Sequence, residues 1–210
     1  AIDAARYPRF LDNAVNGCVI GGTPADFVDD SLILPGSLDL LVIADAGETS
    51  LADTVAVAVS ARNLLLVGDP QPPRAQAAHP QPVQISVMGW LCDGAPTLPA
   101  AHGYFLDRTW RMHPAVCAPV SASCYDGKLR ASETITLARD LAGIAPGVST
   151  VLVDHRGNAT ESDAEAREVV RRVRLLLGET WTSGGRTRKL HPHDVFVVAP
   201  YAAQVARIRT

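Results

Sequence analysis

The stretch L-D-L-L-V-I-A-D-A-G-E, residues 38–48, decides the fold. Leucine and β-branched residues follow one another almost without interruption, and the run ends in the carboxylate of Asp45. A strand that is covered on both faces of a parallel sheet needs this pattern. Ligands of open α/β sheets bind at the carboxyl ends of the strands. The stretch therefore predicts a buried strand whose acidic end lies at a ligand-binding edge.

Four further apolar runs predict strands of the same kind. Residues 63–69 (N-L-L-L-V-G-D) and 194–199 (D-V-F-V-V-A) are the clearest, 150–154 (T-V-L-V-D) is a fourth strand, and 18–20 is a shorter fifth. Each run is short and is bounded by polar or turn residues, as buried strands are. Together they predict a parallel sheet.

Two helices alternate with these strands. Residues 50–61 begin with Ser50 and Asp53, which form a capping box at the first turn. Residues 161–177 carry an apolar stripe, acid–base pairs four residues apart (Asp163 with Arg167, Glu168 with Arg172), and a terminating glycine at 178. Strand–helix alternation of this period predicts an α/β fold with a doubly wound parallel sheet.

Length and charge suggest two parts. A chain of 210 residues forms one large domain or two small ones. Residues 71–103 are rich in proline and predict a long surface excursion, with a domain boundary near residue 105. Residues 1–105 carry 4 Arg against 11 Asp and Glu, a net charge of −7, whereas residues 106–210 carry 15 Lys and Arg against 11, a net charge of +4.

The basic second half has two interpretations that the sequence leaves open. It favours contact with nucleic acid or polyphosphate, or the two halves are simply solvated surfaces of different charge. The same choice applies to four arginines on the predicted helix 161–177, which either grip phosphates or form its solvated face. They are Arg167, Arg171, Arg172 and Arg174.

Several classes of protein are excluded. No apolar run reaches the roughly 18 residues of a membrane-spanning helix. Four cysteines without a C-x-x-C pair indicate reduced thiols in a cytoplasmic protein, not a zinc site or a disulfide framework. The H-P-H segment at 191–193 has no nearby Cys or acidic residue at the spacing of metal ligands. The sequence also contains no G-x-S-x-G motif, which a serine hydrolase of the elbow type would need.

Two polar segments complete the chemistry. The second strand ends in G-D-P-Q, residues 68–71, at the same sheet edge as Asp45. Residues 109–114, T-W-R-M-H-P, place an aromatic beside an arginine, before a proline that suits the first position of a helix. Arginine suits a phosphate group and an aromatic ring suits the face of a base.

In this order the segments resemble the motifs of superfamily 1 helicases. That family has D-E-A-G-Q, G-D-P-x-Q-L and Y-R-M-H-P motifs, and here they read I-A-D-A-G-E (43–48), L-V-G-D-P-Q-P-P (66–73) and T-W-R-M-H-P (109–114). Y-D-G-K-L (125–129) and V-V-A-P-Y-A-A-Q-V (197–205) resemble two later motifs. The resemblance covers roughly residues 18–209.

The resemblance implies two RecA-like lobes of the P-loop NTPase class, with ATP and Mg²⁺ bound in the cleft between them. Residues 1–105 would be the later part of the first domain, and residues 106–210 the early part of the second. The partner would be DNA or RNA, and flanking helicase segments would be missing from this sequence. A phosphate loop, if there is one, would lie before residue 1, and the absence of an initiator Met indicates a processed or excised piece.

The resemblance also implies roles for single residues. Arg111 would reach the γ-phosphate and Trp110 would flank the adenine. Gly68 and Asp69 would couple the nucleotide state to domain closure. Pro72 stands at the position of the family's γ-phosphate-sensing glutamine, so that glutamine is missing unless Gln71 replaces it. The residues near the nucleic-acid track would be Thr23, Tyr201 and Gln204.

Three departures from the family pattern limit the predicted activity. The phosphate loop G-x-x-x-x-G-K-[ST] is absent, since residues 17–23 (G-C-V-I-G-G-T) lack the lysine and contain a predicted strand. In one register Ala44 replaces the Mg²⁺-binding Asp, while Asp45 and Glu48 stand at the catalytic Glu and the Gln. In the other register Asp45 holds the metal and Ala46 replaces the base.

One carboxylate is missing in either register, so we expect no useful ATP hydrolysis by this chain. Two functions remain open. The chain is a segment of an ATP-dependent helicase, or it is a catalytically degenerate nucleic-acid-binding or scaffolding module with the same fold.

Overall fold

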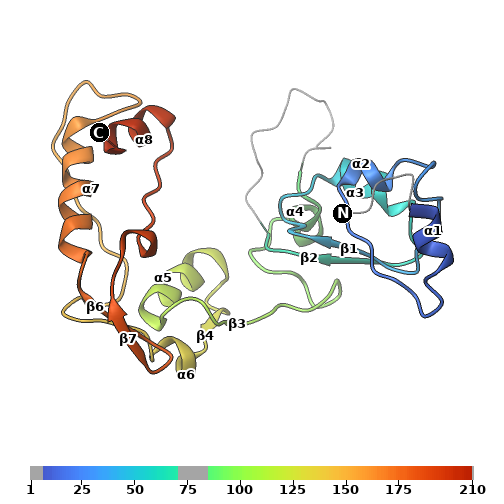
Figure 1. The fold of residues 1–210 in the computed structure, drawn as a ribbon, viewed down its shortest axis with the longest axis horizontal. Helices are drawn as coiled ribbons and strands as arrows, with labels where there is room; N and C mark the ends of the chain where they lie inside the picture. Colours follow the sequence, from blue (N-terminus) through green and yellow to red (C-terminus); the bar gives the residue numbers. More distant parts are fainter. Residues whose placement is uncertain (1–6, 71–84, 210) are drawn as a thin grey trace. The chain divides into compact units, whose positions relative to one another are not determined.

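The computed structural model describes residues 7–70 and 85–209, and it divides the chain into two compact units, Ala1–Phe105 and Leu106–Thr210 (Figure 1). Each unit mixes helices with short strands. The assignment of the two units to RecA-like domains stays a prediction.

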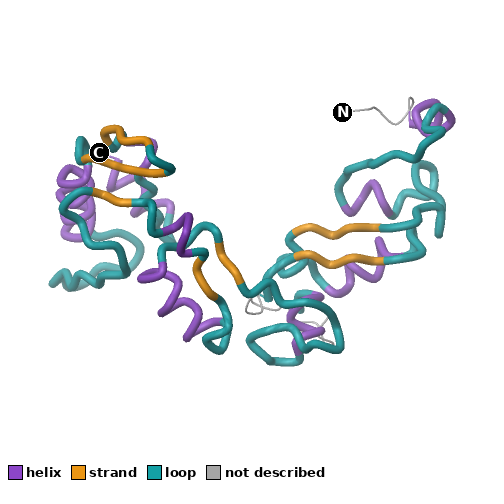
Figure 2. Tube along the Cα trace, turned by 90° about the horizontal axis from the view of Figure 1, so that it is seen from below, coloured by secondary structure: helices purple, strands orange, loops and turns teal. Residues whose placement is uncertain are grey.

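The first unit is built on one pair of parallel strands. Strand β1 (Leu41–Ala44) lies beside β2 (Leu64–Val67), with Leu41 opposite Leu64, and Figure 2 shows the two strands side by side. The strands predicted at residues 38–45 and 63–69 are therefore confirmed, each at a shorter length, but their predicted burial on both faces is wrong, since Val42, Leu65 and Val67 are exposed. The helices of this unit are α1 (Tyr7–Asp12), α2 (Pro24–Phe27), α3 (Leu51–Ala58) and α4 (Val87–Cys92).

The core of this unit lies where the end of β1 meets α4. Ala46, Val87 and Met88 are buried together, and Ile43 and Leu66 of the two strands pack against them. Helix α4 thus belongs to the core, although the prolines around it predicted a surface excursion. The prediction was wrong here because residues 86–92 contain no proline, and Ser86 caps the helix by accepting a hydrogen bond from the backbone of Gly89 at 2.9 Å.

Backbone hydrogen bonds join the beginnings of α3 and α4. Leu51 N donates to Ile85 O at 2.8 Å, and Val87 N donates to Thr49 O at 3.0 Å. The predicted cap of α3 is present, since Ser50 Oγ accepts from Asp53 N at 3.0 Å. The residues 71–84 between β2 and α4 lie outside the described residues.

The second unit contains a short parallel sheet and an antiparallel one. Strands β3 (Arg108–Thr109) and β4 (Arg130–Ala131) are parallel, and β5 (Asp140–Leu141), β6 (Thr180–Ser183) and β7 (Arg186–Lys189) form an antiparallel sheet. The structure is thus mixed α/β with small sheets, and its described residues do not form the single doubly wound sheet that we expected. The helices are α5 (Pro114–Cys124), α6 (Glu133–Thr136), α7 (Asp163–Leu176), the 3₁₀-helix η2 (Pro192–Asp194) and α8 (Ala202–Arg209).

Three predicted strands are absent from the described residues. Residues 18–20, 150–154 and 195–199 form no strand, and residue 194 belongs to η2. Leu152 and Phe196 are 91% and 89% exposed. The physical reason is that an apolar run becomes a strand only beside a partner that accepts its hydrogen bonds, and these runs have none here.

Helix α7 agrees closely with the sequence. Ser162 caps it by accepting from Glu165 N at 3.3 Å, and it ends just before Gly178, which has a φ of +85°. The predicted pair of Glu168 with Arg172 is present at 2.8 Å. The predicted pair of Asp163 with Arg167 is not, because Asp163 lies 3.0 Å from Arg207 of α8 instead. No described helix has the length and apolar character needed to cross a membrane.

Candidate nucleotide-binding site

In the first unit, the two predicted motif segments touch at the carboxyl ends of the parallel strands. Ala46 N donates a hydrogen bond to Val67 O at 3.0 Å. A Cβ atom added at Gly47 would lie 1.7 Å from the carbonyl oxygen of Asp69, and one added at Gly68 would lie 2.6 Å from Ala46 N. Glycine at both positions is therefore what permits the contact. The structure brings the turn after β1 and the residues after β2 to one sheet edge.

The acidic groups of this edge lie on an exposed turn. Asp45 has a φ of +52°, and Glu48 N donates to Asp45 O at 2.8 Å to close the turn. Aspartate tolerates the left-handed conformation better than most residues. Both side chains belong to exposed residues, whereas Ala46 and Gly47 between them are buried. The turn thus presents two carboxylates to solvent and hides its centre.

A magnesium site is not assembled from these side chains alone. Within the described ranges, no group of three or more His, Cys, Asp or Glu side chains could hold a metal ion. Mg²⁺ is usually bound through one or two carboxylates, with waters and substrate phosphates completing its shell. Ala44 adds no oxygen to Asp45 and Glu48. Mg²⁺ therefore stays a prediction from the resemblance, as does the role of Gln71, which lies outside the described residues.

In the second unit, the turn with Trp110 and Arg111 is held from two directions. Thr109 Oγ1 accepts a hydrogen bond from Arg111 N at 3.3 Å and a weaker one from Met112 N at 3.5 Å. The guanidinium of Arg139, 28 residues further along the chain, donates to the carbonyl oxygens of both Trp110 (3.1 Å) and Arg111. A planar guanidinium can donate two hydrogen bonds in parallel, so one side chain fixes two successive peptide groups.

The end of the turn is fixed by helix α5. His113 caps this helix, since its Nδ1 accepts from Ala115 N at 3.1 Å, and Pro114 is the first helical residue, as the sequence predicted. Proline suits that position because its missing N–H has no partner in the first turn of a helix. His113 and Pro114 thus fix the start of α5, while Trp110 and Arg111 before them are exposed.

The exposed groups of this turn suit a nucleotide. Trp110 is 57% exposed, and Arg111 is exposed beside it. A guanidinium binds phosphate oxygens in a bidentate manner, and an indole face packs on a flat ring. Arg139 is the residue of this site that the sequence did not reveal. Its partners are backbone carbonyls, which leave no trace in a motif.

The three residues predicted near nucleic acid have different surroundings. Thr23 is exposed, begins α2 and donates to Asp26 Oδ2 at 2.7 Å. Tyr201 is 50% exposed. Gln204 is 7% exposed, and its amide accepts from Ser162 N at 2.6 Å and donates to Ser162 O at 3.3 Å. The structure thus gives Gln204 an anchoring position between α8 and the start of α7.

Comparison with known proteins identifies one family. A family model described as an AAA domain matches residues 85–210, which is more than half of the chain and includes the Trp110–Arg111 turn. This domain is found in superfamily 1 helicase-like proteins, and it indicates a helicase-like nucleotide-binding module. Comparison with curated proteins and with solved structures gives no match. The chain belongs to the AAA domain family.

Proposed function

We propose that this chain is part of an ATP-dependent helicase or translocase of superfamily 1 that acts on nucleic acid. The observation that carries the proposal is the Trp110–Arg111 turn. It combines an exposed indole and an exposed guanidinium on a backbone held by Thr109 and Arg139. A rigid backbone lowers the entropy cost of ordering such groups around a ligand.

The proposed roles follow the chemistry of the side chains. Arg111 binds the γ-phosphate of ATP, and Trp110 packs against the adenine. In the first unit, Asp45 would hold Mg²⁺ with Glu48 beside it on the same turn, and the contact between Gly47 and Asp69 joins that edge to the second strand. Mg²⁺ supplies positive charge to the phosphates when it is bound.

The proposal includes the expectation that the chain on its own does not hydrolyse ATP at a useful rate. In one register Ala44 replaces the metal-side acid, and in the other Ala46 replaces the general base, so one of the two acidic groups is missing either way. Loss of a positioned general base typically costs about 10²–10⁴-fold in rate. Nucleic-acid-stimulated phosphate release by the purified chain would contradict this part of the proposal.

A second candidate function rests on the same missing acidic group. A chain that has lost a catalytic carboxylate but kept the backbone of the motifs suits a nucleic-acid-binding or scaffolding module. The net charge of +4 on residues 106–210 favours such a module as well.

A titration with a fluorescent ATP analogue and the whole chain separates the two functions. For a nucleotide-binding segment we expect weak but saturable binding, and an Arg111→Ala variant should bind about tenfold more weakly, because a charge-assisted contact is lost. Arg108→Ala is the matched control, since Arg108 is also exposed and lies only three positions earlier. No saturable binding, or equal affinities of the two variants, would reject the nucleotide-binding role of Arg111 and favour the module.

A further inference from the structure

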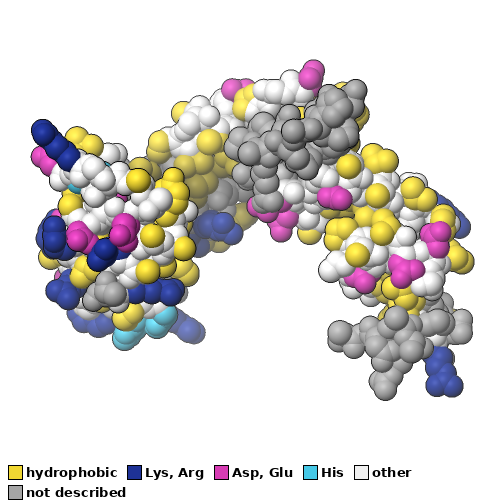
Figure 3. Space-filling view, turned by 90° about the horizontal axis from the view of Figure 1, so that it is seen from above, with side chains coloured by type: hydrophobic (Ala, Val, Ile, Leu, Met, Phe, Trp, Pro, Cys, Tyr) yellow, Lys and Arg dark blue, Asp and Glu magenta, His cyan; other side chains and the backbone are white. Residues whose placement is uncertain are grey.

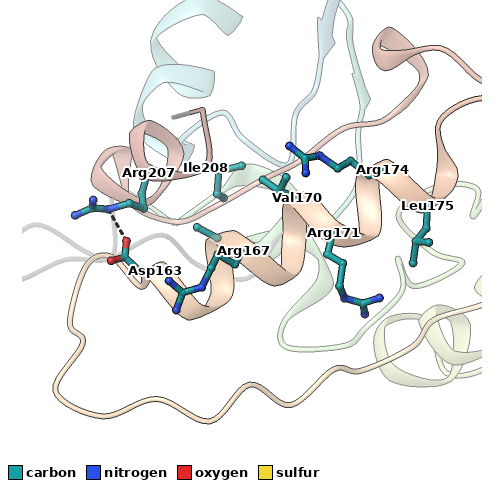
Figure 4. Close-up of a pocket in the computed structure, with 9 residues that line it drawn as sticks. Asp163, Arg167, Val170, Arg171, Arg174, Leu175, Arg207 and Ile208 are labelled. Carbon is teal, nitrogen blue, oxygen red and sulfur yellow. Dashed lines mark ion pairs between the residues drawn. The ribbon is translucent and has the colours of Figure 1, made fainter.

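A pocket of about 680 Å³ lies between α7 and α8, away from the Trp110–Arg111 turn in sequence and built from the second unit alone. Figure 4 shows that α7 supplies most of its lining and that α8 supplies the rest. Four guanidinium groups line it, and apolar side chains lie among them. The residues that matter here are Arg167, Arg171, Arg174, Arg207, Val170 and Ile208.

Two of the four arginines are already neutralised by carboxylates. Arg171 donates to Glu168 at 2.6 and 2.7 Å, and Arg207 lies 3.0 Å from Asp163, the ion pair drawn in Figure 4. These ion pairs leave the pocket with an excess of positive charge only if the other two arginines are unpaired.

Arg167 and Arg174 have no ion pair or hydrogen bond from their side chains within the described part of the chain. They are seven residues apart on α7, which is two helical turns, so both belong to the same face. At 1.5 Å per residue their Cα atoms are separated by about 10 Å along the helix axis. The pocket is therefore lined by two guanidinium groups without a carboxylate partner in the described residues, which come from positions two turns apart on α7.

The charge is local to this unit. Figure 3 shows Lys and Arg side chains gathered on the second unit, in agreement with its net charge of +4. The lining includes Val170 and Ile208 but no aromatic side chain. Stacking on aromatic rings is how proteins hold the bases of single strands, whereas guanidinium groups hold the phosphates. The lining thus suits a repeating phosphate backbone and offers nothing that selects a base.

We infer that this pocket binds the phosphodiester backbone of single-stranded nucleic acid. Arg167 and Arg174 bind phosphates, and Val170 with Ile208 provides an apolar surface for the sugar between them. The inference rests on the proposed function for the nature of the partner, and it adds the place where that partner binds. Because only the backbone is held, binding depends strongly on salt and little on base sequence.

The test measures the binding of the whole chain to fluorescently labelled 20-nucleotide oligo(dT) and oligo(U) by fluorescence anisotropy. Arg167→Glu and Arg174→Glu should each weaken binding about tenfold, and Arg167→Ala and Arg174→Ala less. Arg186→Glu is the matched control, because it makes the same change of charge on an exposed residue of β7 outside the pocket. Circular dichroism establishes that each variant is folded, and the alanine variants replace any glutamate variant that is not.

The dependence on salt gives a second measure. Each arginine removed should make the slope of log affinity against log salt concentration shallower by about 0.7, the value for single strands. Equal losses in Arg186→Glu and the pocket variants would show an effect of net charge alone and overturn the inference, as would no loss in the pocket variants. Displacement of the strand by inorganic triphosphate or polyglutamate at equal charge would also overturn it, because the pocket would then bind anions in general.

The same variants distinguish this inference from the proposed function. Pocket variants should bind the fluorescent ATP analogue as the unchanged chain does. Oligonucleotide binding that depends on Arg167 in a chain that binds no nucleotide would reject the helicase assignment and keep the pocket. If nucleotide binding depends on Arg111 while oligonucleotide binding is unchanged by substitution of Arg167 or Arg174, the helicase assignment is kept and the pocket is rejected as the nucleic-acid site.

Discussion

The sheet edge of the first unit is held by contacts between main chains, whereas the Trp110–Arg111 turn of the second unit is held by side chains. At the edge, hydrogen atoms at Gly47 and Gly68 are all that separates two backbones. At the turn, Thr109 and Arg139 bind backbone groups directly. The difference shows that the shape of the edge does not depend on which acidic side chains it carries. The contact depends on the absence of two side chains and not on the residues at 44 and 45.

The largest effect is expected from Gly47→Ala. The added methyl group would lie 1.7 Å from a carbonyl oxygen of the backbone, which no rotamer change can relieve. We expect the free energy of unfolding to fall by about 3 kcal/mol or more. Urea unfolding followed by circular dichroism measures it. Gly21→Ala is the control, because a Cβ there has nothing within 4 Å, and equal stability of the two variants would refute the main-chain contact.

A smaller effect is expected from Arg139→Ala. It removes two charge-assisted hydrogen bonds to the turn, which together contribute about 1–2 kcal/mol on a partly exposed surface. Hydrogen exchange of the peptides that contain Trp110 and Arg111 should become faster, and nucleotide binding weaker. Arg139→Lys should recover only part of the loss, since an ammonium does not present a planar pair of donors.

Arg130→Ala tests whether the effect belongs to the turn. Arg130 is also an exposed arginine of the second unit, on β4, and its side chain makes no hydrogen bond or ion pair with the turn in the described residues. Similar exchange rates in both variants would show that side chains do not hold the turn.

The smallest effect is expected on the stability of α7, which should depend on pH because its Glu168 side chain titrates. Hydrogen bonds from Arg171 and Arg172 lower the pKa of Glu168 to about 2, from about 4.3 in an unfolded chain. Because the folded pKa is the lower one, this stabilisation is present above pH ~4.3 and is lost as the pH falls toward 2. Exchange protection of α7 should decline over that range, and the decline should be shallower in Glu168→Gln.

The contacts of Gly47 and Gly68 involve no titrating group, so protection of β1 and β2 serves as the internal reference. A decline in β1 and β2 that matches the decline in α7 would mean that the chain unfolds as a whole, and the comparison between the two kinds of contact would fail.

The parts of the fold that the sequence predicted are those with local signals. Strand β1 follows from a continuous apolar run, helix α7 follows from its apolar stripe, and the cap at Ser50 follows from a side chain that acts within three residues. Residues 150–154 carry a strand pattern as good as that of β1, yet they form none. A sequence shows that a segment can pair, but not whether a partner lies beside it.

The antiparallel hairpin of β6 and β7 carries a sequence signal other than an apolar run. Gly184 and Gly185 stand between two polar strands, and both have positive φ, +57° and +73°. Two glycines between strands are a strong indication of a hairpin. The strands were overlooked because Arg186–Lys189 is fully polar and exposed on both faces.

The candidate site was predictable where its residues act through their own side-chain chemistry. Trp110 and Arg111 could be named from their motif, and the structure leaves both exposed. Arg139 and the anchoring contacts of Gln204 could not be foreseen, because their partners are backbone groups 28 and 42 positions away. Such contacts depend on the folded path of the chain and not on any local pattern.

The closeness of Gly47 to Asp69 also limits how the first unit can respond to a ligand. Peptide groups pressed together without intervening side chains have no rotamers through which to absorb a displacement. A displacement of the Asp69 carbonyl therefore presses directly on Gly47, so we expect the Asp45 turn and residues 68–69 to move together.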